Sequence, residues 1–327
     1  SEDALGAPPV ACLRLAGAGV SGRGRVGEPR RISRWISQRS VACGGRKLEL
    51  PAPGMRSERR RPARCWRLFS AGWARWPGRR RGRGRRQVGS AFKPFVYAAA
   101  LERGLSPVST VEGLQSVAIQ AAEGSWTPRD ERPTTRDRLT LREALAESNN
   151  AAAVLLQRRV GSAPVLRLAN DVGVRDQPDV PSLALGSGLV SPLDLTAAYA
   201  VFPSLGVRVR PRGLVSVEDA DGEEVQRRNI EAERILSPEV AFQMVTMLED
   251  VVETGTGAGA RRLGVHGAIG GKTGTTNEAR DAWFVGYTGN YVGAVWFGND
   301  DHTSTNKLTG GSLPAQLWHD VMEPAHQ

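Results

Sequence analysis

Ser90 and Lys93 are the residue pair whose types and spacing best fit covalent chemistry. They open an apolar run, and side chains three residues apart at a helix start lie on one face. Lysine can accept the serine proton if burial or a nearby cation lowers the lysine pKa. A helix N-terminus adds a positive dipole and a free backbone N–H. This pair therefore predicts a serine nucleophile with a lysine base.

A second Ser-x-x-Lys occurs at Ser304 and Lys307, within a polar segment. No apolar helical pattern follows it, so nothing there would bury the lysine and lower its pKa. We interpret this second pair as solvated surface.

Two further motifs offer a hydroxyl, an amide and a lysine. Ser148-x-Asn150 lies where one short helical pattern ends and the next begins, which also suits a plain helix N-cap. Lys272-Thr273-Gly274-Thr275 precedes two aromatic and β-branched runs separated by Gly289-Asn290, the pattern of a β-hairpin. We expect the Lys-Thr-Gly segment to be a third strand at the open edge of this sheet. Its glycines would let another backbone approach, and its lysine and hydroxyls could hold a peptide carboxylate.

The elements that must position these motifs are readable from local signals. Pro94 is acceptable only in the first turn of a helix, so that helix begins near Ser90, and Gly104 ends it. Thr140 and Glu143 form a capping box that opens the short helix before Ser148. The three motifs thus fall on a helix start, a helix junction and an edge strand.

The three motifs together resemble the transpeptidase domain of class A penicillin-binding proteins. Ser148 follows Ser90 by 58 residues, and Lys272 follows Ser148 by 124. Ser-x-x-Lys and Lys-Thr-Gly are paired in β-lactamases and penicillin-binding proteins. Segments 281–284 and 310–315 add to a resemblance that covers about residues 85–327. It implies an α/β fold of the α+β type, with an antiparallel sheet flanked by helices.

The resemblance also implies a role for each motif residue. Ser90 would be acylated by a D-Ala-D-Ala stem peptide, with Lys93 as the general base. Ser148 and Lys272 would pass the proton to the departing D-Ala. The backbone N–H groups of Ser90 and Thr275 would form the oxyanion hole.

The substrate would be held by the edge strand and by one amide. Thr273 and Thr275 would bind the terminal carboxylate, with Gly274 between them in the substrate-binding strand, and Asn150 would bind the stem-peptide amide. A second stem peptide would resolve the acyl-enzyme into a cross-link, whereas β-lactam antibiotics would stall it. No cofactor or metal is implied, and the scattered histidines favour neither a zinc site nor a Ser-His-Asp triad: His266, His302, His319 and His326.

Several alternatives remain open. A D,D-carboxypeptidase would differ only in using water as acceptor. A class A β-lactamase needs a glutamate that activates water, but residues 180–190 carry no charge. An inactive fragment is a further alternative, because the family places two strands before the nucleophile helix and residues 50–84 lack that pattern.

Charge divides the chain in two. Residues 1–89 hold 22 Lys+Arg and 5 Asp+Glu, whereas residues 90–327 hold 22 and 29. We predict that 1–86 is a basic irregular segment and that 87–327 is the transpeptidase domain. The composition of residues 1–84 suggests a frameshifted reading of a GC-rich gene, so we expect few contacts with the domain. A basic arm that binds nucleic acid is the alternative reading, and we expect no nucleic-acid partner.

The location of the intact protein follows from the resemblance alone. Class A members carry a glycosyltransferase domain and an N-terminal anchor, and neither is recognisable in this sequence. The chain begins at Ser1, so we expect a fragment of a longer protein. The intact protein would work with the cell-wall synthesis machinery at the periplasmic face of the bacterial inner membrane.

Overall fold

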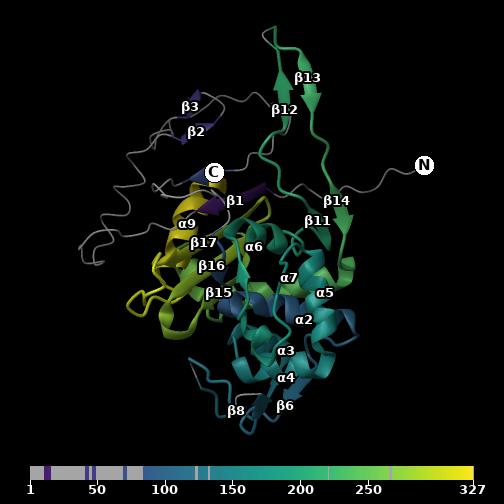
Figure 1. Ribbon diagram of the computed structural model, residues 1–327, viewed down its shortest axis with the longest axis vertical. Coiled ribbons are helices and arrows are strands. Elements are labelled where there is room, and N and C mark those ends of the chain that lie inside the picture. Colours follow the sequence, from purple (N-terminus) through teal and green to yellow (C-terminus); the bar gives the residue numbers. More distant parts are fainter. Residues whose placement is uncertain are drawn as a thin grey trace.

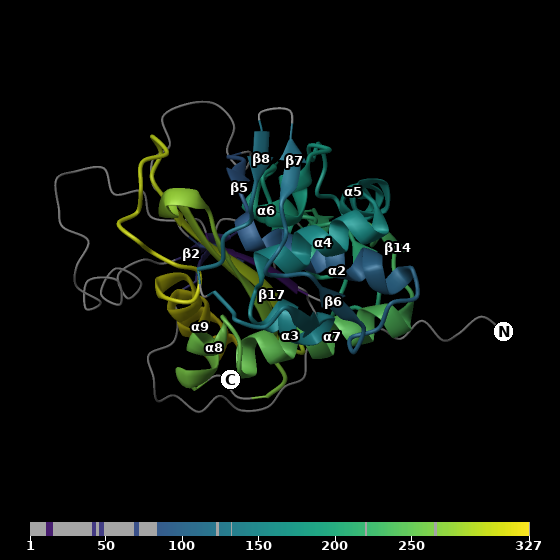
Figure 2. The same ribbon diagram turned by 90° about the horizontal axis from the view of Figure 1, so that it is seen from below.

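The computed structural model describes residues 84–327 and four short strands before them. The described strands are 11–15, 41–43, 46–48 and 69–71, and residues 122–123, 132, 220, 265–266 and 327 are excepted from the main range. A sheet lies between a large helical lobe and a smaller helical layer (Figures 1 and 2). The predicted fold class is confirmed by this arrangement and by the solved relatives described below.

The central strands form an antiparallel meander. β15 (Gly270–Thr275) pairs with β16 (Asp281–Tyr287), which pairs with β17 (Tyr291–Gly298) through the predicted Gly289-Asn290 turn. The strand order places β15 at the edge of the sheet, as predicted. The Lys-Thr-Gly motif is therefore presented along one border of the sheet.

Side chains of β16 alternate between two cores, as the pleat requires. Trp283 and Val285 belong to the main core under the helical lobe. Phe284 faces the smaller layer, where its ring meets Trp318 of α9 (Leu313–His326) edge-on at a centroid distance of 5.2 Å. Helices thus bury both faces of the sheet and fix the plane of the motif strand.

The helical lobe is built around α2 (Lys93–Glu102), whose residues from Lys93 to Leu101 are all buried. An apolar helix without a polar face requires neighbours on every side.

No helix in the described part of the chain is long and apolar enough to cross a membrane. The other helical elements are η1 (Gly89–Phe92), α3 (Leu141–Ala146), α4 (Asn150–Val160), α5 (Ser162–Asp171), η2 (Pro181–Leu185), α6 (Pro192–Tyr199), α7 (Pro238–Glu253), α8 (Ala258–Arg262) and η3 (Asn277–Ala279).

Two strands of the basic segment differ from our expectation. β1 (Ala11–Leu15) pairs with β17, and β4 (Phe69–Ala71) pairs with β1, both in parallel. The expectation of few contacts with the domain is wrong for these strands. The physical reason is that β17 would otherwise present an unpaired backbone edge, which any extended segment can satisfy. Apart from these two strands and the strand pair 41–43 and 46–48, residues 1–83 lie outside the described residues, and the frameshift hypothesis falls on them.

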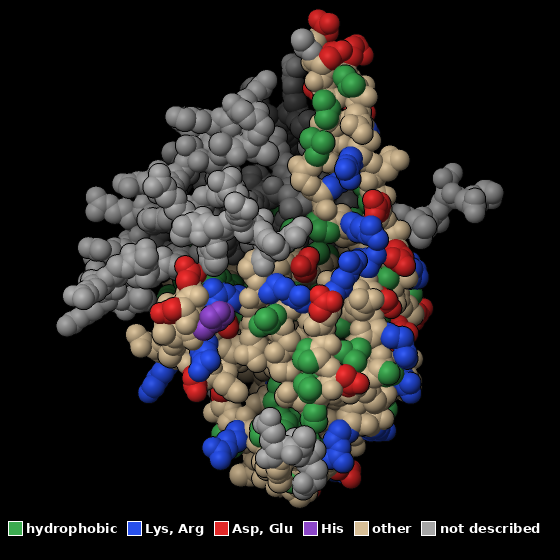
Figure 3. All heavy atoms as spheres, viewed as in Figure 1, with side chains coloured by type: hydrophobic (Ala, Val, Ile, Leu, Met, Phe, Trp, Pro, Cys, Tyr) green, Lys and Arg blue, Asp and Glu red, His purple; other side chains and the backbone are tan. Residues whose placement is uncertain are grey.

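Several short two-stranded sheets lie outside the central sheet. One of them, formed by β12 (Ser216–Glu218) and β13 (Glu224–Arg227), projects from the body as an arm, and acidic side chains gather at its tip (Figure 3). Over the body on that face, acidic and basic side chains of the described residues are interspersed. The remaining strands are β2 (Val41–Cys43), β3 (Arg46–Leu48), β5 (Arg86–Gln87), β6 (Thr110–Glu112), β7 (Ile119–Ala121), β8 (Gly124–Trp126), β9 (Arg138–Thr140), β10 (Leu189–Val190), β11 (Val207–Val209) and β14 (Ala232–Arg234).

A substitution at Gly274 tests how closely η1 packs on the motif strand. A Cβ there would lie 2.5 Å from the carbonyl oxygen of Val88, so Gly274→Ala must push backbone apart. We expect a loss of about 1–3 kcal/mol in the free energy of unfolding, as for other overpacked sites. Gly289→Ala is the matched control, because a Cβ at Gly289 meets nothing within 4 Å. Equal unfolding midpoints for the two variants in urea would contradict this packing.

Candidate active site

Ser90 lies in the 3₁₀ turn η1, directly before the first α-helical residue, Lys93. The Lys93 backbone N–H donates to the Ser90 carbonyl, and residues three apart in a 3₁₀ turn eclipse one another. The predicted helix start is thus confirmed, with both side chains on one side. Ser90 is partly exposed, and its hydroxyl makes no hydrogen bond to any described residue. It is therefore available to an incoming carbonyl.

Backbone contacts join this turn to the motif strand. Gly89 has a φ of +56°, and a Cβ there would lie 2.6 Å from the carbonyl oxygen of Thr275. Only glycine combines this φ with so close an approach. The Gly89 N–H also donates to the Gly186 carbonyl at 3.2 Å, which ties the turn to the loop after η2. Ser90 is consequently held beside Thr275.

Ser148 occupies a strained position between α3 and α4, with a φ of +58°. Such a φ is uncommon outside glycine, and it concentrates at functional sites. The N-cap of α4 is Asn149, whose side chain accepts from the Ala152 N–H. The Ser148 hydroxyl is therefore not used for capping and remains available to the site.

A chain of hydrogen bonds connects all three motifs. Lys93 Nζ lies 3.2 Å from Ser148 Oγ and 2.7 Å from Asn150 Oδ1, and it also contacts the Ser148 carbonyl. Lys272 Nζ lies 2.8 Å from the same Ser148 Oγ. The Ser148 hydroxyl thus stands between two amines that come from different elements.

Burial controls the charges of these amines. Both lysine side chains are fully buried. Burial lowers the pKa of Lys93 to about 7, against the opposing effect of the Asp130 and Glu131 charges. Burial also lowers the pKa of Lys272 well below its ordinary value, and the charge of Lys93 lowers it further. Desolvation therefore favours a neutral amine, the form that accepts a proton.

The threonines of the edge strand lie beside one another but have different partners. Thr273 Oγ1 donates to Thr256 Oγ1 at 2.8 Å, and Thr275 Oγ1 accepts from the Gly310 N–H at 3.3 Å.

The eight predicted site residues thus come together from η1, α2, the α3–α4 junction and β15. The expectation that glycine permits close backbone approach at this edge is confirmed by the contact of Gly274 with Val88.

Two site residues were missed by the sequence analysis. Thr256 follows α7 and carries no motif, although it pairs with Thr273. Asp130 lies in an irregular loop, and its carboxylate accepts from the Asn149 side chain and from the Asn150 N–H. Neither Thr256 nor Asp130 belongs to a sequence motif or a periodic pattern. Thr256 contacts a residue of a different element, and Asp130 lies in an irregular loop, so no local pattern in the sequence indicates either contact.

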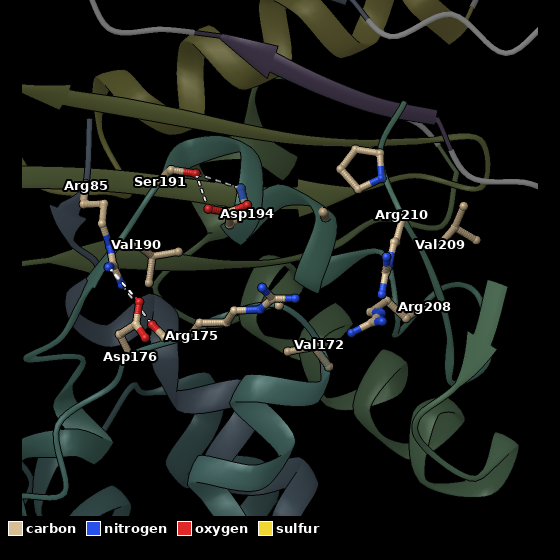
Figure 4. A pocket seen from close by; sticks show the side chains of 13 residues that line it. Arg85, Val172, Arg175, Asp176, Val190, Ser191, Asp194, Arg208, Val209 and Arg210 are labelled. Carbon is tan, nitrogen blue, oxygen red and sulfur yellow. Dashed lines mark hydrogen bonds and ion pairs between the residues drawn. The ribbon is translucent and has the colours of Figure 1, made fainter. Parts of the chain in front are cut away.

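Other potential sites lie apart from this cluster. A cavity of about 640 Å³ is lined by Arg85, Arg175, Arg208 and Arg210 among others, and by none of the eight predicted residues (Figure 4). Within the described ranges, no three His, Cys, Asp or Glu residues lie close enough together to hold a metal ion.

Comparisons with known proteins agree with the geometry. A family model described as the penicillin binding protein transpeptidase domain matches residues 82–323. Penicillin-binding protein 1A of Aquifex aeolicus is 39% identical over 241 residues, which are 73% of this chain and 33% of that protein. Penicillin-binding protein 1A of Neisseria meningitidis is 36% identical over 247 residues, covering 72% and 31%. The chain thus spans about a third of the curated relatives it matches.

Solved structures show the same fold. Penicillin-binding protein 1A of Haemophilus influenzae superimposes with a TM-score of 0.69 and 28% identity, over 74% of this chain and 42% of that one. Penicillin-binding protein A of M. tuberculosis, solved as a penicillin G acyl-enzyme complex, gives a TM-score of 0.64 at 21% identity, over 74% and 61%. With the matched range spanning all three motifs, this chain belongs to the transpeptidase domain family of penicillin-binding proteins.

Proposed function

We propose that this domain is a serine D,D-transpeptidase that cross-links peptidoglycan stem peptides. The observation that carries the proposal is the hydrogen-bond chain from Lys93 through Ser148 to Lys272, with Ser90 in the turn that leads into Lys93. Nucleophilic catalysis requires a base within reach of the nucleophile and a route for its proton. Family membership supports both the reaction class and the substrate.

Acylation forms one bond and breaks one. Ser90 Oγ attacks the carbonyl carbon of the D-Ala-D-Ala peptide bond while neutral Lys93 takes the hydroxyl proton. The tetrahedral oxyanion is stabilised by the backbone N–H groups of Ser90 and Thr275. Ser148 and Lys272 then relay a proton to the departing D-Ala nitrogen. The product is an ester on Ser90 and a free D-Ala.

Deacylation transfers the acyl group to a second peptide. The acceptor amine attacks the ester carbon, its proton returns through the lysines, and Ser90 is regenerated. Before D-Ala departs, Thr273 and Thr275 bind its carboxylate beside Gly274 of the same strand, and Asn150 binds the stem-peptide amide. A β-lactam would acylate Ser90 in the same way. Its leaving group stays attached after ring opening, which blocks the acceptor.

The neutral loop beside Ser90 favours transpeptidation over β-lactamase chemistry. Residues 180–190 include η2 and pack on Gly89, and they contain no carboxylate that would activate water. An acyl-enzyme lacking such a base survives until a stronger nucleophile arrives. A D,D-carboxypeptidase, which uses water, is the alternative outcome. The intact protein would act at the periplasmic face of the inner membrane with the cell-wall machinery.

The first test concerns the nucleophile. Ser90→Ala removes the only atom that the mechanism acylates, so a fluorescent penicillin should no longer label the full chain. Ser304→Ala, which alters the other Ser-x-x-Lys, should leave labelling unchanged. Labelling is read by gel fluorescence and by mass spectrometry of the labelled peptide. A label retained by Ser90→Ala would refute the assignment.

The second test concerns the carboxylate clamp. Thr273→Val keeps the side-chain shape but removes the hydroxyl that now pairs with Thr256. The acylation rate with penicillin should fall, because the variant loses about 1–3 kcal/mol of transition-state stabilisation. This is the usual loss for a hydrogen bond to a charged group. Thr254→Val, at an exposed position after α7, is the control. Equal second-order acylation rates for the two variants would exclude the role of Thr273.

The third test concerns pH. Protonated Lys93 has no lone pair for the Ser90 proton, and protonation dominates below its pKa of about 7. The acylation rate should therefore rise as pH increases through about 7 and then level off. Stopped-flow acylation measured across this range, with the fold monitored by circular dichroism, provides the check. If the acid limb of the pH–rate profile for acylation gave the ordinary lysine pKa near 10, Lys93 would not be a neutral base.

A further inference from the structure

The loop before β9 holds the Ser148–Asn150 turn from outside. The Asp130 carboxylate uses both oxygens: Oδ2 accepts from the Asn149 side chain at 2.8 Å, and Oδ1 accepts from the Asn150 N–H. The neighbouring Arg129 carbonyl accepts from the Asn150 side-chain amide. Three contacts from two loop residues therefore fix two consecutive residues of the turn.

This turn needs such support because its backbone is strained. Ser148 has a φ of +58°, a conformation that persists only where the surroundings determine it. The Ser148 carbonyl and hydroxyl both meet Lys93, so a small rotation of the turn would break both contacts. Asp130 holds the two residues that follow Ser148 in the sequence, Asn149 and Asn150. Its contacts therefore determine where the Ser148 hydroxyl lies.

The charge of Asp130 also acts on the catalytic lysine, Lys93. Lys93 is influenced by the negative charges of Asp130 and Glu131, which raise its pKa against burial, and Lys93 lowers the pKa of Lys272 in turn. Tyr97, one helical turn after Lys93, is buried, and its hydroxyl has no partner among the described residues. Burial raises the pKa of Tyr97, so it stays neutral. The charges that face Lys93 are thus two carboxylates and one amine.

We propose that Asp130 is a positioning residue for the transpeptidation proposed above, on which this inference rests. Its two hydrogen bonds hold the Ser148 hydroxyl between Lys93 and Lys272, and its charge balances the Lys93 ammonium that forms during acylation. The hydrogen bonds of Asp130 go to Asn149 and Asn150, not to Ser90 or to the threonines of β15. Its effect is transmitted through Asn149, Asn150 and Lys93.

The test separates position from charge with three variants of the full chain. Asp130→Asn removes the charge and one acceptor, so penicillin acylation at the pH plateau should slow roughly tenfold, and the acid limb should move to lower pH. Asp130→Glu keeps the charge but displaces it, so the plateau should fall while the acid limb stays. Glu131→Gln removes a nearby charge without the turn contacts. Its acid limb should move to lower pH at an unchanged plateau.

Asp137→Asn is the matched control, because Asp137 lies in the same loop but pairs with the Gln115 N–H. It should change neither plateau nor acid limb. A purely structural role predicts a lower melting temperature with an unchanged acid limb. Wild-type plateau and acid limb in Asp130→Asn would overturn the proposal, and Asp130→Glu takes over the test if Asp130→Asn does not fold.

A second readout keeps this inference distinct from the proposed function. NMR titration of ¹³C-labelled lysine follows Lys93 without any reaction, and Asp130→Asn should lower its pKa. If wild-type protein fails to acylate, the proposed function is refuted while the Lys93 titration still tests the influence of Asp130. An unchanged Lys93 titration in Asp130→Asn would refute the charge effect.

Discussion

Two buried lysine amines share one serine hydroxyl, and the rest of the site depends on this arrangement. Lys93 Nζ and Lys272 Nζ lie 3.2 and 2.8 Å from Ser148 Oγ. Two ammonium charges so close in a poorly solvated region repel strongly, so at least one amine must be neutral. A neutral amine has two N–H donors and one lone pair. Lys93 Nζ can donate to two of the three oxygens around it, the Ser148 carbonyl, Asn150 Oδ1 and Ser148 Oγ, and its lone pair is then left for a proton.

The fold keeps the Ser90 turn and the Lys-Thr-Gly strand in register through close backbone packing. Gly89 and Gly274 let η1 rest directly on β15, while Trp283 of β16 packs beneath it and donates to the Gln87 carbonyl at 2.8 Å. Since a displacement of about 1 Å can cost a site much of its rate, such rigid contacts suit its chemistry.

Much of this site was predictable because its signals are local. Pro94, the Thr140 capping box and the Gly289-Asn290 turn each specify the backbone within a few residues, and the structure follows them. Asp130 and Thr256 were not predictable, because their partners lie across irregular segments. The parallel pairing of β1 with β17 was missed for another reason. A free sheet edge recruits a strand through its backbone, which leaves no mark in the side-chain pattern.

The neutral amine is the central claim, and the chain allows a direct measurement of it. The sequence has four lysines, Lys47, Lys93, Lys272 and Lys307, so ¹³Cε NMR of labelled lysine gives few signals to assign. Exposed Lys307 serves as the internal reference. A Lys93 signal that titrates near pH 7 would confirm that burial prepares the base. Lys93 and Lys272 signals that both titrate near the ordinary lysine pKa of about 10.4 would contradict it.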